Sequence, residues 1–145
     1  MLGVLALVLV AAVGLSLATR RRPPSGLVEG RLRPCPDTPN CVSSQSGGEP
    51  QSVRPLRFEG DPQEAFARLV GLVDALPRTE LVQHVEGYAH FEVTTALMRF
   101  RDDLEFQLDA TAGVIHLRSC SRVGRSDLGT NRRRVEAIRA AFEDR

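Results

Sequence analysis

The residues with the clearest chemical potential lie in one segment near the C-terminus, which reads SCSRVGRSDLGTNRRRVEAIR (residues 119–139). Gly124 and Gly129 permit turns that expose backbone N–H groups, and the arginines supply charged forks that suit a carboxylate or a phosphate. A loop of this kind that leads into a helix N-terminus is a common way to bind an anion. The sequence therefore predicts an anion-binding loop formed by Ser121, Arg122, Ser126, Asp127, Asn131 and Arg132.

The same segment presents an electrostatic problem. Three consecutive arginines, residues 132–134, occupy the first turn of the predicted last helix. A helix N-terminus carries a partial positive charge, so each arginine there costs about 0.3–1 kcal/mol. Negative charge must therefore lie close by, either on a bound anion or on carboxylates of the chain itself. In the second case Asp127 caps the helix and pairs with Arg132. The other internal candidates are Asp102, Asp103 and Glu136, the last of which follows Arg132 by one helical turn.

Catalysis remains an alternative because two other patterns contain reactive groups. Asp102 and Asp103 are adjacent in RDD, which predicts a turn between two strands. Carboxylates in such a turn suit the hard cation of a metal-assisted hydrolase, although aspartate is also an ordinary turn residue. Cys41 offers a thiol as a second option.

A binding role is nevertheless favoured over an enzymatic one. The sequence contains no Ser-His-Asp signature, P-loop or dinucleotide fingerprint. Its three cysteines lack the spacing of a zinc site. We therefore expect no resident metal and no cofactor.

The N-terminal residues predict attachment to a membrane. Residues 2–19, LGVLALVLVAAVGLSLAT, carry no charge and precede three arginines. About 18 residues form a helix of about 27 Å, near the lower limit for crossing a bilayer. We therefore expect a transmembrane or signal-anchor helix over residues 1–22. The following arginines place the domain in the cytoplasm by the positive-inside rule, whereas an export signal would place it in the periplasm or outside the cell.

Cysteine usage depends on the side of the membrane. Cys35 and Cys41 lie six positions apart in PCPDTPNC. This pair could close a disulfide in an oxidising compartment and would stay reduced in the cytoplasm. The sequence leaves both possibilities open.

Composition narrows the partners. All 19 basic residues are arginine, which is typical of GC-rich bacterial coding, and the net charge is only +1. The chain has no tryptophan and one tyrosine, so platforms for base stacking are scarce. With neither a general positive charge nor stacking platforms, nucleic acid is not an expected partner.

Length and patterning predict one folded domain behind the anchor. Residues 23–50 are rich in proline, glycine and serine, which is typical of a linker that runs into an irregular, cysteine-containing segment. Residues 51–145 then form a single α+β domain. It begins with a short edge strand over residues 52–58, which Pro55 keeps from a central position.

The domain continues with a helix, four strands and a second helix. Asp61 suits the N-cap of the first helix, with Pro62 at N1 and Glu64 at N3. Apolar residues then alternate with polar ones across residues 78–121, which predicts four strands joined by short turns. The order β-α-β-β-β-β-α predicts an antiparallel sheet with two helices packed on one face. TATA-box-binding-protein-like and helix-grip folds share this order, an analogy of fold that carries no function.

Several of these motifs together resemble the signature blocks of domain of unknown function family 1499. They are PCPDTPNCVSSQ (residues 34–45), YAH (residues 88–90), RDDLEF (residues 101–106) and LRSCSRVGRSDLGTNRRRVEAIR (residues 117–139). The resemblance runs from about Arg33 to the C-terminus and excludes the anchor. It implies membership of a family that supplies no activity. Its members often follow an N-terminal anchor or export signal, which weighs against the cytoplasmic side.

Taken together, the patterns predict a membrane-anchored, non-catalytic binding domain. Its loop before the last helix would engage an anionic ligand or a lipid head group. The alternatives are the metal-assisted or thiol-dependent enzyme described above, and a structural envelope protein whose polar segments only hold the fold together.

Overall fold

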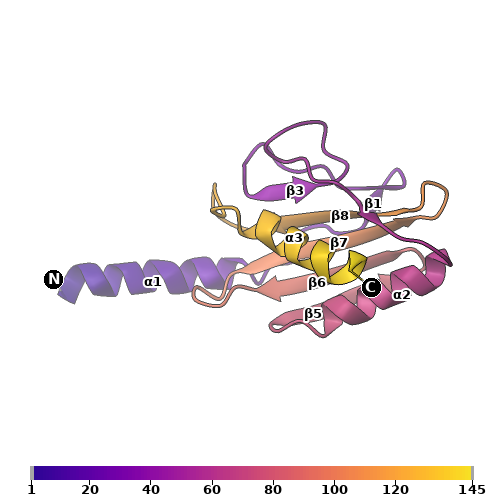
Figure 1. Ribbon diagram of the computed structural model, residues 1–145. Coiled ribbons are helices and arrows are strands. Elements are labelled where there is room, and N and C mark those ends of the chain that lie inside the picture. Colours follow the sequence, from indigo (N-terminus) through magenta and orange to yellow (C-terminus); the bar gives the residue numbers. More distant parts are fainter. Residues whose placement is uncertain (1, 145) are drawn as a thin grey trace.

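The computed structural model describes residues 2–144, which form three helices and eight strands (Figure 1). In chain order these are α1 (Leu2–Ala18), β1 (Leu27–Val28), β2 (Arg31–Leu32), β3 (Cys41–Ser43), β4 (Leu56–Arg57), α2 (Pro62–Asp74), β5 (Thr79–Val85), β6 (Tyr88–Thr94), β7 (Arg101–Asp109), β8 (Val114–Ser121) and α3 (Thr130–Glu143).

The main sheet has six strands, five of which follow the order β3-β8-β7-β6-β5, while β4 also pairs with β8. All of these pairings are antiparallel, and β1 and β2 form a separate two-stranded ribbon. Helices α2 and α3 lie across one face of the main sheet (Figure 1). The prediction of an α+β fold with an antiparallel sheet is confirmed.

Helix α2 forms as its sequence predicts. The Asp61 carboxylate accepts a hydrogen bond from the backbone N–H of Glu64 at 2.9 Å, and Pro62 occupies the first helical position. The apolar stripe of the helix then packs on the sheet and on α3. The buried core contains Phe66, Leu69, Val73, Phe91, Leu104, Phe106, Ile115, Leu117, Val135, Ile138 and Phe142.

Residues 23–50 differ from the predicted linker, because they contribute β3 to the main sheet. Cys41 in β3 pairs with Cys120 in β8, and both residues are buried. Strands of two or three residues are too short to show a period of two, which explains why the sequence did not reveal β1, β2 and β3.

The prediction that RDD forms a turn is wrong. Asp102 and Asp103 lie inside β7, and the turn falls on residues 95–100, where the alternation of apolar residues slips. The backbone N–H of Thr95 donates to the carbonyl oxygen of Phe100 at 2.8 Å and closes this turn. Charged residues at strand positions resemble turn residues in a sequence when their partners come from distant segments.

The two faces of the sheet carry opposite chemistry, because successive side chains of a strand point to opposite sides. Phe91, Leu104 and Leu117 face the helices and belong to the core. The opposite face, here called the polar face, carries buried titratable side chains. They are Tyr88, His90 and Glu92 on β6, Asp103 and Glu105 on β7, and Cys120 on β8.

Residues 19–36, here called the covering segment, lie over the polar face. The carbonyl oxygen of Thr19 accepts a hydrogen bond from Arg122 at 2.7 Å. The backbone N–H of Gly26 donates to Glu105 at 3.2 Å. Charged side chains are almost never fully buried unless they are paired. The covering segment therefore excludes water from a set of charges whose partners must come from the chain.

Helix α1 covers the predicted apolar run. Among residues 2–144, no helix is both long and apolar enough to cross a membrane. The membrane anchor stays a prediction.

Candidate functional site

Gly129 is the N-cap residue of α3, and Asp127, two positions before it, supplies the carboxylate that accepts from the N–H groups of this helix end, as predicted. One carboxylate oxygen of Asp127 accepts from the backbone N–H of Gly129 at 3.0 Å, and the other accepts from that of Asn131 at 2.7 Å. Burial alone would raise the pKa of Asp127, but the backbone N–H groups of Asn131 and Gly129 outweigh it and hold the pKa below its ordinary value. Asp127 therefore supplies negative charge at the helix terminus, where it is stabilising.

Asp127 is expected to stabilise the domain only where it is ionised. Replacement with alanine should cost about 1 kcal/mol near neutral pH, the usual value of an N-cap. The folded pKa lies below the unfolded one, so this stability is fully present above the unfolded pKa of about 4 and is lost as the pH falls towards the folded pKa. Urea unfolding over a pH series measures the free energy of unfolding of the full chain and of Asp127→Ala. The difference between the two free energies should become smaller as the pH falls. The exposed Asp37, replaced in the same way, serves as control, and a difference that stays constant with pH would contradict this assignment.

The three arginines that open α3 find their partners inside the chain. Arg134 donates to Asp102 at 2.6 Å. Arg132 donates to the carbonyl oxygens of Pro50 and Ser52 at 2.7 and 2.9 Å and lies 3.4 Å from Glu49. The predicted pairing of Arg132 with Asp127 is therefore wrong, because Arg132 turns towards residues 49–52 instead.

Arg133 completes this set. Its guanidinium donates to the carbonyl oxygen of Leu128 at 2.8 Å. The three arginines therefore meet carboxylates and carbonyl groups of the chain itself. The sequence analysis had left open whether a bound anion or the chain would supply these partners.

The polar face contains a second and more deeply buried set of ion pairs, centred on Arg122. Its side chain is 3% exposed. The guanidinium donates two hydrogen bonds to Asp103, of 2.9 and 2.7 Å, and it lies 2.9 Å from a carboxylate oxygen of Glu92. Burial alone would lower the pKa of Arg122, but Asp103 and Glu92 outweigh it and raise the pKa above its ordinary value.

His90 and Asp103 form the next pair. The Nε2 of His90 lies 2.7 Å from a carboxylate oxygen of Asp103, and both side chains are buried. Burial works to raise the pKa of Asp103, but the hydrogen bonds from Arg122 and His90 outweigh it and hold the pKa below its ordinary value. Asp103 is therefore a permanent charge at neutral pH.

Glu105 is a second carboxylate of the polar face with partners inside the chain. It accepts from the hydroxyl of Tyr88 at 2.7 Å and from Arg118 at 2.9 Å. Burial and the neighbouring Glu105 carboxylate raise the pKa of Tyr88 far above its ordinary value. Tyr88 thus remains a neutral hydrogen-bond donor.

A pocket of about 420 Å³ lies between the covering segment and strands β7 and β8. Its volume lies within the range of small-molecule sites. Two buried donors on its lining residues, the Nε atoms of Arg33 and Arg118, have no hydrogen-bond partner among the described residues. Its lining comprises Pro23, Pro24, Ser25, Arg33, Pro34, Cys35, Pro36, Asp103, Glu105, Arg118, Cys120, Ser121 and Arg122.

A larger groove of about 900 Å³ lies at the opposite side, between α2, the end of α3 and the β7–β8 turn. Two of its charged side chains already have partners: Arg68 donates to the carbonyl oxygen of Phe142 at 2.8 Å, and Glu143 accepts from the backbone N–H of Arg57 at 3.0 Å. None of the unpartnered buried side-chain atoms found in residues 2–144 belongs to a residue that lines this groove. The smaller pocket is therefore the better candidate site.

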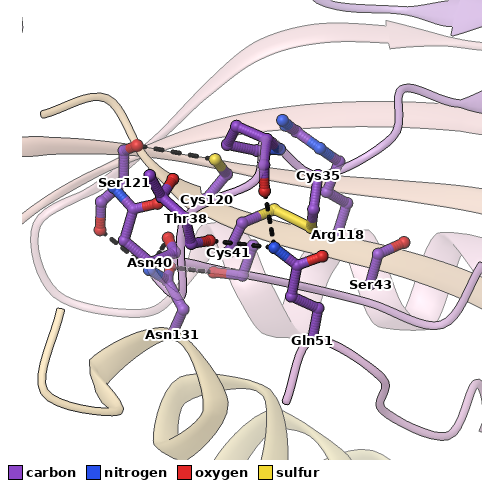
Figure 2. The surroundings of a disulfide bond; sticks show 12 residues. Cys35, Thr38, Asn40, Cys41, Ser43, Gln51, Arg118, Cys120, Ser121 and Asn131 are labelled. Carbon is purple, nitrogen blue, oxygen red and sulfur yellow. Dashed lines mark hydrogen bonds between the residues drawn. A yellow bond between two sulfur atoms is a disulfide. The ribbon is translucent and has the colours of Figure 1, made fainter. Parts of the chain in front are cut away.

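The cysteines lie at the edge of this pocket. Cys35 and Cys41 form a disulfide, and Cys120 lies beside them on β8 as a free thiol (Figure 2). Burial raises the pKa of Cys120, so it is a poor nucleophile. Cys41 likewise does not offer the thiol that the second enzyme alternative requires, because its sulfur is bonded to Cys35.

The hydrolase alternative based on Asp102 and Asp103 fails on geometry. As consecutive residues of β7 they point to opposite faces, where Asp102 meets Arg134 and Asp103 meets Arg122. Two carboxylates on opposite faces of a sheet cannot bind one cation together. Each of them instead neutralises an arginine.

The structure divides the predicted site residues into two groups. Ser121 and Arg122 line the pocket. The others lie on the turn before α3 and in its first turn, and they are Ser126, Asp127, Asn131 and Arg132. Ser126 accepts from the backbone of Leu128 at 3.2 Å, which closes that turn.

The sequence analysis did not place Arg33, Glu105 or Arg118 in the anion site, and these three residues complete the pocket. A signal for two of them was present. Glu105 occupies the polar phase of LEFQLD, and Arg118 occupies the polar phase of VIHLRS. Opposite charges on the same phase of two neighbouring strands predict that the side chains pair across the sheet, whether or not that face is buried. Nothing in the local sequence of Arg33 indicates its place.

Comparison with known proteins gives one match. The family profile described as "Protein of unknown function (DUF1499)" matches residues 31–142, from β2 into the last turn of α3. No curated protein and no solved structure matches the chain.

Proposed function

Because the chain belongs to the DUF1499 family, whose description assigns no activity, we propose its function from the geometry of the pocket. The protein is a membrane-attached, non-catalytic binding domain that takes a small anion, a carboxylate or a phosphate, beneath its covering segment. One observation carries this proposal: the pocket is lined by two arginines whose buried Nε donors have no partner among the described residues.

The charge of the pocket supports an anion. Three arginines and two carboxylates line it, which leaves one positive charge in excess. Arg122 is paired with Asp103 and Arg118 is paired with Glu105, so the excess charge lies with Arg33. A buried donor without a partner costs about 1–3 kcal/mol. An anionic oxygen placed between Arg33 and Arg118 would relieve that cost and gain charge-assisted hydrogen bonds.

This proposal keeps the anion predicted from the sequence but moves its site. The arginines in the first turn of α3 have internal partners, whereas the pocket retains free donors. Arg122, which belongs to the predicted loop, links the two regions because it lies at the end of β8 and reaches the polar face.

Attachment to a membrane through α1 is part of the proposal, and the domain is placed on the extracytoplasmic side. The Cys35–Cys41 disulfide supports an oxidising compartment. The three arginines after α1 favour the cytoplasm by the positive-inside rule. One of them, Arg22, lies 3.5 Å from the buried Glu92 and so has a structural role, which weakens that argument. An alkaline phosphatase reporter fused to the C-terminus should be active, and an inactive reporter would overturn this side.

Binding can be tested by thermal unfolding of the full chain in mild detergent. Inorganic phosphate or acetate should raise Tm in a saturable way, because a ligand that binds only the folded state stabilises it. Arg33→Gln should remove most of that rise. Arg33 is preferable to Arg118, whose loss would leave Glu105 buried without its cation. Arg31→Gln is the matched control, since Arg31 lies two positions away on β2 and does not line the pocket.

Two outcomes would contradict the binding proposal. Sodium chloride at matched ionic strength could raise Tm as much as phosphate does, which would indicate general screening. Alternatively, Arg33→Gln could retain the full rise in Tm, which would show that the anion binds outside this pocket.

A further inference from the structure

We propose that the end of the domain next to α1 docks on the surface of a phospholipid bilayer with anionic head groups. This end, here called the α1 end, comprises the β6–β7 turn (residues 95–100), the β8–α3 loop (residues 122–129) and the residues directly after α1. The inference rests on the proposed membrane attachment of α1 and goes beyond it. It states that the folded domain lies against the membrane and does not hang from a free tether.

The α1 end carries apolar side chains that a water-facing surface does not explain. Leu97 is 88% exposed, Leu128 is 83% exposed and Met98 is 41% exposed. The turn that carries Leu97 is closed by two hydrogen bonds between Thr95 and Phe100 of 2.8 and 2.9 Å. The apolar tip is therefore held outward by a defined turn.

The pairing of the strands places these residues together. Thr94 pairs with Arg101, and Asp102 pairs with Ser121, so the β6–β7 turn and the β8–α3 loop leave the same end of the sheet. Helix α1 joins there as well. The Ser16 hydroxyl lies 3.3 Å from the carbonyl oxygen of Arg99, and Arg122 donates to the carbonyl oxygen of Thr19.

Charge supports anionic lipid as the occupant. Four exposed arginines belong to the α1 end, and they are Arg20, Arg21, Arg99 and Arg125. The carboxylate of this end, Asp127, is used to cap α3. The opposite end of β6 carries the exposed Glu86. Arginine side chains are attracted to an anionic bilayer surface, so several arginines beside exposed leucines match a head-group region with acyl chains beneath it.

The direction of α1 gives the same arrangement. Figure 1 shows α1 extending away from the sheet, roughly along the strands, from the end that carries the β6–β7 turn. The surface of α1 is continuously apolar and exposed. If α1 enters a bilayer along its normal, Leu97 and Leu128 reach the interface while the pocket stays in water.

Tryptophan fluorescence of the full chain tests the proposal, because the chain has no tryptophan of its own. Leu97→Trp and, as matched control, Val85→Trp are each reconstituted in vesicles of phosphatidylcholine with phosphatidylglycerol. Val85 is also apolar and exposed, but it ends β5 and pairs with Tyr88 at the other end of β6, about 20 Å away along the strand. Brominated lipid should quench the tryptophan at position 97 and leave the one at position 85 unchanged. Quenching should weaken several-fold without phosphatidylglycerol.

The other possible results distinguish docking of the folded domain from attachment of α1 to the membrane. Equal quenching at positions 97 and 85, with the protein still floating with the vesicles, would overturn docking and leave α1 attached. Shielding of position 97 from acrylamide without quenching by brominated lipid would show that a protein or a second copy covers the α1 end. Quenching that does not depend on phosphatidylglycerol would overturn the role of the arginines. Failure to float with vesicles would overturn attachment and docking together.

Discussion

Replacement of Arg122 with glutamine is expected to lower the free energy of unfolding by about 3–5 kcal/mol, the usual cost of removing one partner from a buried ion pair. Arg122 is 3% exposed and neutralises Asp103 and Glu92, which come from different strands. Glutamine cannot supply the charge, so both carboxylates would remain buried with fewer cations. A loss of this size is a large part of the 5–15 kcal/mol that stabilises an ordinary domain.

Urea unfolding followed by circular dichroism measures this loss. Arg125→Gln is the matched control, because Arg125 lies three positions further on and is exposed, and its replacement should change stability by less than about 0.5 kcal/mol. Addition of Asp103→Asn to Arg122→Gln should recover part of the loss, since one buried charge then disappears together with its partner. A loss below about 1 kcal/mol in Arg122→Gln would show that the remaining partners, Arg22 and Arg101 at Glu92 and His90 at Asp103, satisfy the two carboxylates.

The same contacts connect the pocket to the α1 end. Arg122 reaches Asp103 in the pocket with one edge of its guanidinium and the carbonyl oxygen of Thr19 after α1 with another nitrogen. Arg122 thus holds both the start of the covering segment and the Asp103 side chain that lines the pocket. A ligand that draws on Arg118 or Arg33 would meet a preorganised wall, which lowers the cost of binding.

Prediction of the fold from the sequence worked where local signals agreed. The cap at Asp61, the apolar stripe of α2 and the period of two in β5–β8 each arise from neighbouring residues, so the sequence contains them directly. The short strand β3 could not be predicted in this way. Its place depends on a disulfide and on pairing with β8, about 80 positions away.

The site was predicted less well, for a physical reason. The arginine run of α3 indicated correctly that negative charge must lie nearby, and Asp127 and Asp102 supply part of it. The sequence could not show which carboxylate Arg122, Arg132 or Arg134 meets, because each of these pairs joins different elements. The second charged layer was hidden because a buried polar face and a solvated one give the same alternation until a covering segment is known.

The second large effect concerns Arg134 and Asp102, which join α3 to β7 on the helix side of the sheet. Arg134 donates to Asp102 at 2.6 Å and to Ser119 at 2.9 Å, and the carboxylate is 2% exposed. Arg134→Leu is expected to lower the free energy of unfolding by about 3–5 kcal/mol near neutral pH, because it leaves Asp102 buried without its cation. The double variant Arg134→Leu with Asp102→Asn should recover much of this loss, and urea unfolding of both variants gives the coupling energy.

The pH dependence distinguishes this pair from the cap at Asp127. Burial already raises the pKa of Asp102 even though Arg134 opposes it, and loss of Arg134 must raise the pKa further. A carboxylate whose pKa is higher in the folded state binds more protons there, so Arg134→Leu should regain stability as the pH falls towards 4. The double variant has no carboxylate at this position and should not show that gain. If the loss in free energy of unfolding of Arg134→Leu stays the same at every pH, Asp102 must find another partner. That result would contradict Arg134 as the necessary partner of Asp102.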